Sequence, residues 1–254
     1  MARFKVGVQL HPQHTTMGEL REAWRAADAM GVDSIWVWDH FFPLYGAADG
    51  PHFEGWVTLS TLAADTRLAK VGMLVTGNGY RNPELLADMA RTVDHVSGGR
   101  AYLGIGAGWF ERDYDEYGYE FGTGGSRLKA LESSLERIKA RLAKLNPPPM
   151  GRLPILIGGG GEKVTLGLVA RFADAWNGFG PPETYAHKNR VLDQHCADVG
   201  RDPAEIERTV LINGDEFGDA DAYLEAGATH IILGTGAEGE FELTDIQRLI
   251  DLRR

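Results

Sequence analysis

Short apolar segments alternate with amphipathic helical segments along the chain, and this alternation constrains the fold more than any other feature of the sequence. Strand-like segments cover residues 4–10, 34–39, 69–76, 100–108, 154–158, 175–179, 209–213 and 230–233. Strands that alternate with helices pair in parallel, and eight such strands can close into a barrel. The chain has 254 residues, a usual size for that architecture. The sequence therefore predicts an α/β fold, a (β/α)8 TIM barrel formed as a single domain by residues 1–254.

Several helices carry clear start signals. Thr16 followed by Glu19 is a capping box, and Asn82 followed by Pro83 is an N-cap with proline at the first helical position. Thr244 is expected to cap the last helix. Further helices are expected over residues 56–65, 126–145, 162–173, 183–199 and 220–226.

Composition excludes several classes of partner. The formal net charge is -10 with no cluster of lysine and arginine, so the sequence predicts no nucleic-acid partner. No apolar run is long enough to cross a bilayer, and no secretory signal begins the chain, so no membrane partner is expected. Cys196 is the only cysteine, which excludes an internal disulfide and fits a reducing compartment. We expect a cytoplasmic protein in which Cys196 packs within a helix.

Three glycines alternate at the end of the fourth predicted strand. Gly104, Gly106 and Gly108 would point to one face, because alternate residues of a strand share a face. Such glycines serve either a crowded barrel interior or bend, or a flat ligand that lies against bare backbone. Trp109 and Phe110 follow at once, where the strand would open into a loop.

The carboxyl ends of barrel strands carry the active site, and the fifth such end is a run of glycines. Gly158, Gly159, Gly160 and Gly161 lead toward a helix, followed by Glu162 and Lys163. Bare amides at the positive end of a helix favour phosphate. A plain turn would need fewer glycines. The run is not a P-loop, because no Gly-Lys-Ser/Thr follows.

The second strand end supplies an acid/base candidate. Asp39 and His40 are adjacent there, and histidine is easily tuned near neutral pH. The alternative is a histidine that only satisfies a hydrogen bond. His11 and His14 could join this pair in a metal site, but the ligand pattern of a metal hydrolase is absent, so no metal is predicted. Facing carboxylates for glycoside hydrolysis would have to be Glu111 and Asp215, which nothing else supports.

Four blocks of sequence resemble the luciferase-like monooxygenase superfamily, especially its deazaflavin (coenzyme F420)-dependent branch. The likeness covers nearly the whole chain. The blocks are Ile35-Trp-Val-Trp-Asp39-His40-Phe-Phe, Val75-Thr76-Gly-Asn-Gly-Tyr-Arg81-Asn-Pro83, Ser97-Gly-Gly-Arg100 through Trp109, and Ile157 through Lys163.

The resemblance implies a flavin or deazaflavin over the strand ends, and a non-proline cis peptide in strand three, placed here between Met73 and Leu74. The residues that it places at the cofactor are Asp39, Met73, Leu74, Thr76, Gly106, Gly108, Gly158, Gly159, Gly160, Gly161, Glu162 and Lys163. In a related sugar-phosphate dehydrogenase the Asp39-His40 pair helps to bind the cofactor and remove a proton. Relatives are often homodimers, which we expect here.

The same comparison with the family assigns the substrate side. Catalytic roles are expected for Asp39, His40 and Trp109, and Trp109 stands where that dehydrogenase has a catalytic glutamate, so its reaction is not expected here. The aromatic set suggests a less polar substrate. The expected substrate-pocket residues are His11, Phe41, Phe42, Phe110 and Asn177.

One departure from the family lies between Leu145 and Pro154, where relatives carry a longer excursion that can cover the site. Either the pocket is more open here, or this sequence lacks a segment. An open pocket would let the glutamate tail of coenzyme F420 leave, with Lys163 and Arg112 as basic groups near its mouth.

We therefore predict an oxidoreductase that transfers a hydride between bound coenzyme F420 and a small organic substrate. The alternatives are a monooxygenase that uses reduced FMN and oxygen, and a non-catalytic flavin-binding barrel for storage or sensing.

Overall fold

The strands close into a ring. In the computed structural model, which describes residues 4–253, β1 (Lys5–Leu10) pairs in parallel with β2 (Ser34–Val37) and with β9 (His230–Thr235). The ring is completed by β3 (Lys70–Met73), β5 (Ala101–Gly106), β6 (Ile155–Gly158), β7 (Ala175–Gly178) and β8 (Glu207–Ile212). A short β4 (Thr76–Gly77) pairs with β5 beyond the end of β3. The predicted (β/α)8 barrel is confirmed.

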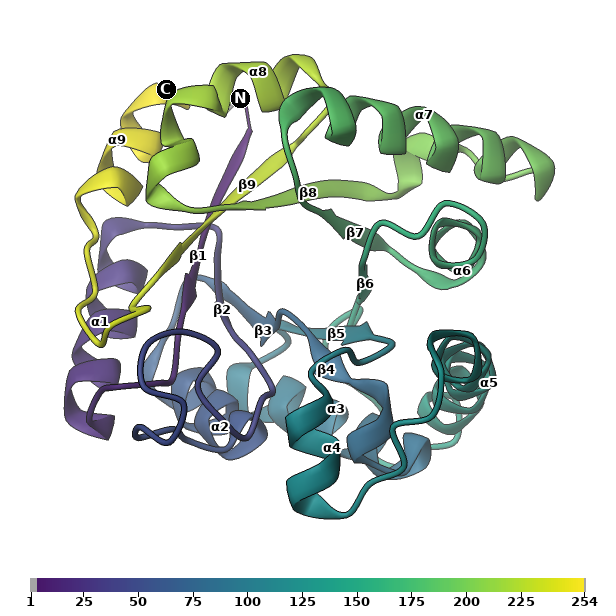
Figure 1. The fold of residues 1–254 in the computed structure, drawn as a ribbon, viewed down its shortest axis with the longest axis horizontal. Helices are drawn as coiled ribbons and strands as arrows, with labels where there is room; N and C mark the ends of the chain where they lie inside the picture. The colour runs from purple at the N-terminus through teal and green to yellow at the C-terminus, as the bar shows by residue number, and fades with distance from the viewer. Residues whose placement is uncertain (1–3, 254) are drawn as a thin grey trace.

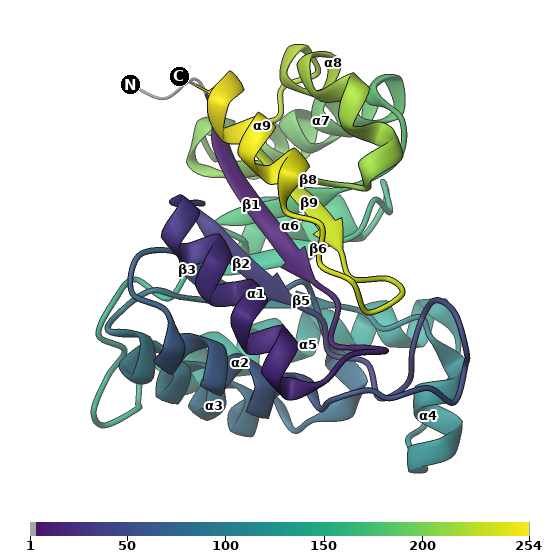
Figure 2. The same ribbon diagram turned by 90° about the vertical axis from the view of Figure 1, so that its left-hand side faces the viewer.

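Helices surround this ring (Figure 1). They are α1 (Met17–Met30), α2 (Gly55–Asp65), α3 (Pro83–Ser97), α5 (Gly124–Leu142), α6 (Thr165–Phe172), α7 (Pro182–Asp198), α8 (Ala220–Glu225) and α9 (Thr244–Leu252). A further helix, α4 (Glu111–Tyr117), lies apart from them, beyond the strand ends (Figure 2). Short 3-10 turns occupy Asn78–Tyr80, Pro203–Glu205 and Gly214–Asp219. The last helix and the first strand are neighbours, and Arg253 of the terminal turn bonds Asp33 at 2.5 Å.

The start signals of the first helices are confirmed, and three other details are wrong. Thr16 and Glu19 form the capping box of α1, and Asn82 caps α3. Helix α6 begins at Thr165 instead of residue 162, and Leu243, not Thr244, is the N-cap of α9. Helix α4 was not predicted, because seven residues are too few to show a helical period.

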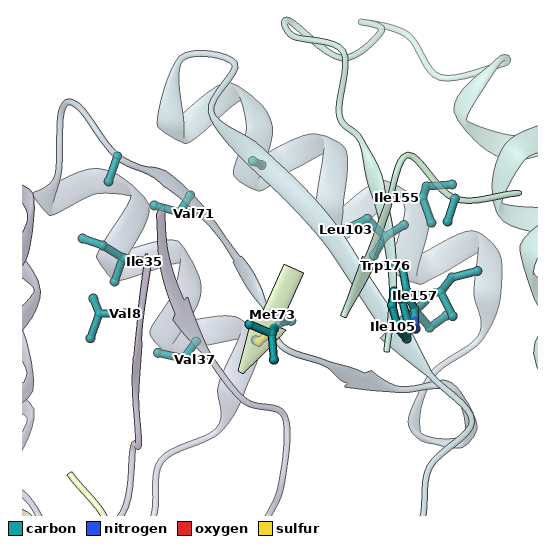
Figure 3. Packing of buried hydrophobic residues seen from close by; sticks show 14 of the residues in the cluster. Val8, Ile35, Val37, Val71, Met73, Leu103, Ile105, Ile155, Ile157 and Trp176 are labelled. Carbon is teal, nitrogen blue, oxygen red and sulfur yellow. The ribbon is translucent and has the colours of Figure 1, made fainter. Parts of the chain in front are cut away.

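The apolar core has two layers, set by the alternation of side chains along each strand. One layer packs between the strands and the helices, and Figure 3 shows part of it: Val8, Ile35, Val37, Val71, Met73, Leu103, Ile105, Ile155, Ile157 and Trp176. The other layer fills the ring with Trp36, Leu74, Leu156, Ala175 and Ile232. Cys196 is buried in the outer layer, as expected for a packing residue. Within residues 4–253 no helix has the length and apolar character needed to span a membrane.

The loop between α5 and β6 corrects a prediction about the site. Its Gly151 amide bonds Asp94 at 2.9 Å, and the Pro148 carbonyl oxygen bonds His95 at 2.8 Å. Both partners lie in the last turns of α3, just before β5 begins, so the loop lies at the amino ends of the strands. The segment 145–154 therefore cannot open or cover a site at their carboxyl ends.

The cis peptide joins Leu74 and Val75, one residue later than predicted. Met73 still belongs to the β3 ladder, where it is in register with Val37. The chain stops pairing with β2 only after Met73, and β4 then pairs with β5 from Thr76.

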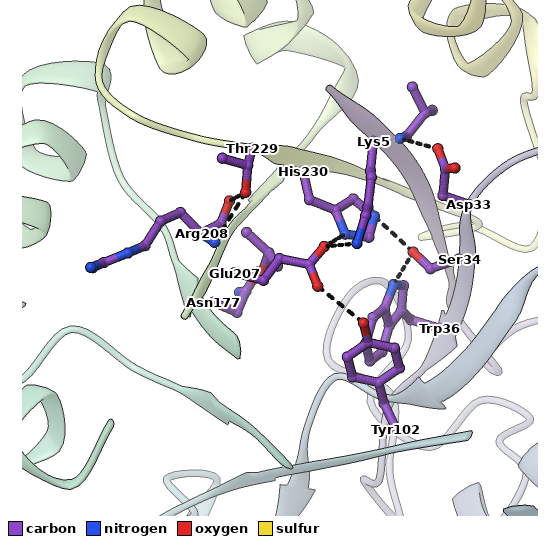
Figure 4. A network of polar contacts seen from close by, with 12 residues as sticks. Lys5, Asp33, Ser34, Trp36, Tyr102, Asn177, Glu207, Arg208, Thr229 and His230 are labelled. Atoms are coloured by element: carbon purple, nitrogen blue, oxygen red, sulfur yellow. Dashed lines mark hydrogen bonds and ion pairs between the residues drawn. The ribbon is translucent and has the colours of Figure 1, made fainter. Parts of the chain in front are cut away.

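A buried polar network lies inside the ring at its amino end (Figure 4). Glu207 accepts hydrogen bonds from Lys5 at 3.0 Å and from the Tyr102 hydroxyl at 3.0 Å, and lies 2.9 Å from His230. The other nitrogen of His230 lies 2.9 Å from the Ser34 hydroxyl. Burial alone would raise the pKa of Glu207, but hydrogen bonds and charges from His230 and Lys5 lower it to about 2. This carboxylate joins residues of β1, β5, β8 and β9.

We predict that Glu207→Gln destabilises the fold at pH 7 by roughly 3 kcal/mol. A carboxyl whose pKa is lowered by folding stabilises the protein above its ordinary pKa and loses that effect as the pH falls. The difference in unfolding free energy should therefore vanish between about pH 5 and pH 2. Urea unfolding over this pH range measures it, with Glu205→Gln, an exposed neighbour, as the control. A difference that does not change with pH would contradict the assignment.

Candidate active site

A hollow of about 470 Å³ opens at the carboxyl ends of the strands. Its volume is in the range of small-molecule sites. The predicted site residues that line it are Asp39, His40, Leu74, Thr76, Gly106, Gly108, Trp109, Gly158, Gly159 and Asn177. Two aromatic rings flank it with large exposed areas: Trp109 is 64% exposed and Phe179 is 60% exposed. The strand-end prediction thus brought together residues from five different strands or their loops.

The bulge between β3 and β4 forms one wall. Gln9 donates a 2.6 Å hydrogen bond to the Leu74 carbonyl oxygen and holds the bulge from β1. Val75 then points across the ring: a Cβ added at Gly106 would lie 2.9 Å from its side chain, and one at Gly158 would lie 3.0 Å away. The Val75 side chain therefore packs against the bare backbone of Gly106 and Gly158, and Val75 itself forms part of the surface of the hollow here.

Asp39 is held in a buried ion pair. Arg81 donates to its two oxygens at 2.5 and 2.9 Å, and also binds Glu54 at 2.6 Å. Asp39 is 1% exposed. Burial raises the pKa of Asp39, and the Arg81 guanidinium opposes that rise. A fork of two parallel bonds to an arginine fixes both oxygens, so Asp39 is not placed to carry protons.

His40 is held by a carboxylate from α4. Its Nδ1 lies 2.6 Å from Asp113, whose second oxygen accepts the Phe41 amide at 3.0 Å. Tyr80 also donates to Asp113, at 2.7 Å. Burial and this bond raise the pKa of Tyr80, so its hydroxyl remains a donor. With Nδ1 occupied, Nε2 is the ring nitrogen that remains for a reacting group, which is the arrangement of a general acid or base.

The glycine turn after β6 differs in one respect from the prediction. Residues 162–164 separate the run from α6, which begins at Thr165. Gly158 and Gly159 line the hollow, while Gly160 and Gly161 lie outside it. Gly159 has φ +126°, which favours glycine. A Cβ added at Gly160 would meet, among the described residues, only the Lys188 side chain at 3.7 Å. Lys188 itself pairs with Glu162 at 2.5 Å.

Other predicted residues lie outside the hollow. Met73 is fully buried beneath it. Phe41 stacks on Tyr117, with ring centroids 4.1 Å apart, and Phe42 lies under Arg112. Phe110 contacts the edge of His40. His11 lies in a neighbouring hollow, and Glu162 and Lys163 lie beyond the glycine turn.

Several residues of the site had no recognisable signal in the sequence. Arg81 belongs to the motif Val75–Pro83, but the sequence did not show that it pairs with Asp39. Asp113 lies in α4, a helix that the sequence did not predict. The missed lining residues are Gln9, Trp38, Leu44, Tyr45, Val75, Gly77, Tyr80, Ala107, Thr165, Phe179 and Leu211. Within residues 4–253 no group of three His, Cys, Asp or Glu side chains could hold a metal ion.

The chain is similar in sequence to known proteins over most of its length. The family described as luciferase-like monooxygenase matches residues 1–214. The chain is 30% identical to the phthiodiolone/phenolphthiodiolone dimycocerosates ketoreductase of Mycobacterium tuberculosis, over 81% of this chain and 64% of that protein. It thus spans just under two thirds of that relative's length. It is 25% identical to the F420-dependent glucose-6-phosphate dehydrogenase of Amycolatopsis mediterranei, over 97% of this chain and 80% of that protein.

Solved structures share the fold. An F420-dependent secondary alcohol dehydrogenase in complex with an F420-acetone adduct superposes with a TM-score of 0.87 at 16% identity, covering 99% of both chains. The coenzyme F420-dependent tetrahydromethanopterin reductase of Methanopyrus kandleri gives a TM-score of 0.78 at 15% identity, again over 99% of both chains.

We predict that Arg81→Met destabilises the protein by about 3–5 kcal/mol, because it leaves the Asp39 carboxylate buried without its cation. Asp39→Asn combined with Arg81→Met should recover part of that loss. Arg137→Met is the matched control: Arg137 also binds a carboxylate through two bonds, to Glu84, but at the surface, so it should cost less than about 1 kcal/mol. Urea unfolding at pH 7 measures all three. Equal losses for the two single variants would show that the Asp39 pair is not effectively buried.

Proposed function

Because the chain belongs to the luciferase-like monooxygenase family, we propose that it is an oxidoreductase in which bound coenzyme F420 exchanges a hydride with a small organic substrate. The observation that carries the proposal is the His40–Asp113 pair at the edge of a hollow that Val75 also lines. A storage or sensing barrel would not need a carboxylate-held histidine there. The expected homodimer remains a prediction.

The residues present fit a flat cofactor with a phosphate. The surface that Val75 forms where it packs on Gly106 and Gly158 could face the ring. The backbone around Gly160 could hold the phosphate, because no side chain needs the space there except the end of Lys188. The Lys188 ammonium supports an anion at this position. These are the residues that we propose as contacts of the ring and the phosphate. Glu162 pairs with Lys188, and Lys163, further out, would meet only the tail of coenzyme F420.

Two observations bear on the choice between coenzyme F420 and FMN. The F420-dependent relatives described above favour coenzyme F420. The loop at residues 145–154 lies at the other end of the barrel, so it provides no exit for the tail of coenzyme F420. Arg112 binds Asp49 and the Ala48 carbonyl oxygen, so it is already engaged in the folded protein.

The protein would supply the proton that accompanies the hydride. A deazaflavin carries hydride but does not activate oxygen as reduced FMN does. His40 Nε2 would take the hydroxyl proton when an alcohol is oxidised, or give a proton to the carbonyl oxygen when a ketone is reduced. Asp113 would hold the ring in place and stabilise its charged form. Trp109 and Phe179 would cover the substrate and exclude water.

The first test is a titration of the protein with each cofactor. We expect coenzyme F420 to bind at least about tenfold more tightly than FMN, which is about 1.4 kcal/mol. Lys188→Gln should weaken both cofactors, since each carries a phosphate, and Lys163→Glu should weaken coenzyme F420 more than FMN. Lys144→Gln, an exposed lysine at the amino end of the barrel, is the control. Equal or reversed affinities, with oxygen consumed in the presence of reduced FMN, would favour the monooxygenase instead.

The second test concerns the proton. His40→Ala should lower kcat by roughly 10²–10⁴, the usual range for a general acid or base, while the Kd of the cofactor changes much less. Asp113→Asn should lower kcat by roughly 10–100, and Asp115→Asn, exposed on the same helix, should not lower it. Turnover of acetone and simple secondary alcohols, followed by the absorbance of the cofactor, measures these changes. Normal turnover in His40→Ala would show that the histidine only lines the hollow.

A further inference from the structure

A second hollow, of about 410 Å³, adjoins the first at the carboxyl ends of β1, β8 and β9. Tyr45 lines both hollows and is 48% exposed. The loop after β9 closes one side: its Ala237 carbonyl oxygen accepts a 2.5 Å bond from Gln13, and Figure 2 shows this loop beside the end of β1. A molecule in the first hollow could therefore extend into the second past the Tyr45 ring.

The second hollow is acidic. Asp215, Glu242 and Asp245 line it, and it has no basic lining residue except the imidazole of His11. Asp245 binds Arg248 at 2.8 Å. Among the ion pairs formed within residues 4–253, none involves Asp215 or Glu242. Two carboxylates thus face the hollow without a cation.

His11 contributes a buried imidazole ring to the wall of the hollow. The side chain is 4% exposed, and its Nδ1 has no hydrogen-bond partner among the described residues. The Nε2 side of the ring is turned toward Gly234, which also lines the hollow; a Cβ added there would lie 3.2 Å from Nε2. Burial lowers the pKa of His11 to about 3, so the ring is neutral near pH 7 and does not repel a cation.

Aromatic faces complete the surroundings. His11 stacks on Trp38 with ring centroids 4.3 Å apart, and Tyr45 lies 5.7 Å from His11. A cation is attracted both to carboxylates and to the face of a tyrosine ring. No metal-binding cluster occurs in the part of the chain that the structure describes, so carboxylates beside aromatic rings here favour an organic cation.

We propose that this second hollow binds an alkylammonium group, the cationic end of a substrate whose reacting carbon lies in the first hollow. The assignment of the first hollow rests on the proposed function, whereas binding of the ammonium group does not. His11, predicted from the sequence as a substrate-pocket residue, would contact this cationic end.

Three probes of one shape test the proposal by isothermal titration calorimetry. Choline is the cation, 3,3-dimethyl-1-butanol is its neutral counterpart, and 3,3-dimethylbutanoate is the anion. We expect choline to bind at least about tenfold more tightly than the neutral alcohol, and the anion to bind most weakly. Added salt should weaken choline and leave the alcohol unchanged. Equal affinities for choline and the alcohol would overturn the proposal.

Paired variants assign the charge preference to this hollow. Asp215→Asn combined with Glu242→Gln should weaken choline at least about fivefold without changing the binding of the alcohol. Glu238→Gln combined with Glu240→Gln removes the same net charge from exposed residues of the β9–α9 loop that do not line the hollow, and should leave choline binding unchanged. Equal effects of the two pairs would show that only the overall charge matters, and would overturn the assignment.

A parallel titration with coenzyme F420 separates this proposal from the proposed function. If coenzyme F420 binds and choline shows no preference over the alcohol, the second hollow is not an ammonium site and the proposed function stands. If choline binds with the expected preference and coenzyme F420 does not bind, the ammonium site stands and the proposed function fails.

Discussion

The Met73 carbonyl oxygen lies where a Cβ on residue 104 would have to be, and this close approach shapes the whole carboxyl end of the barrel. Only glycine at position 104 lets β3 end against β5 in this way. The chain then bulges and carries Val75 across the ring toward Gly106 and Gly158. A ring of eight parallel strands would otherwise be filled with side chains. Here Val75 of the bulge packs on the two glycines and forms part of the lining of a hollow instead.

The sequence predicted the fold well, because the alternation of apolar and amphipathic segments is a local pattern that repeats along the whole chain. In the glycine strand, crowding explains both Gly104, which meets the Met73 carbonyl oxygen, and Gly106, which meets Val75. A ligand against this strand stays a prediction, although Gly106 lines the hollow. Asp39 and His40 were visible because they stand at a strand end. Their partners, Arg81 and Asp113, lie 42 and 73 residues further along the chain, where no local pattern could reveal the pairing.

The errors have physical reasons too. The cis peptide was placed one residue too early, because the sequence does not show at which residue β3 stops pairing with β2. In the structure this pairing extends to Met73, which is in register with Val37. The loop at 145–154 was misplaced for a different reason. It connects a helix to the following strand, and in a barrel of this kind such loops lie at the amino ends, away from the site. The place of this segment, after a helix and before a strand, indicates at which end of the barrel it lies, and its short length does not.

A carboxylate ties elements together at each end of the barrel, half-buried Glu207 at the amino end and buried Asp113 at the carboxyl end, but with different outcomes. At the amino end, Glu207 is surrounded by donors, and His230 is bonded through both ring nitrogens. At the carboxyl end, Asp113 is equally well satisfied, yet among residues 4–253 His40 is bonded through Nδ1 alone and lines a hollow. An imidazole with both nitrogens engaged can only stabilise. One that is fixed through one nitrogen keeps its orientation and has the other nitrogen unbonded, and the proton transfer that we propose for His40 depends on this difference between the two ends.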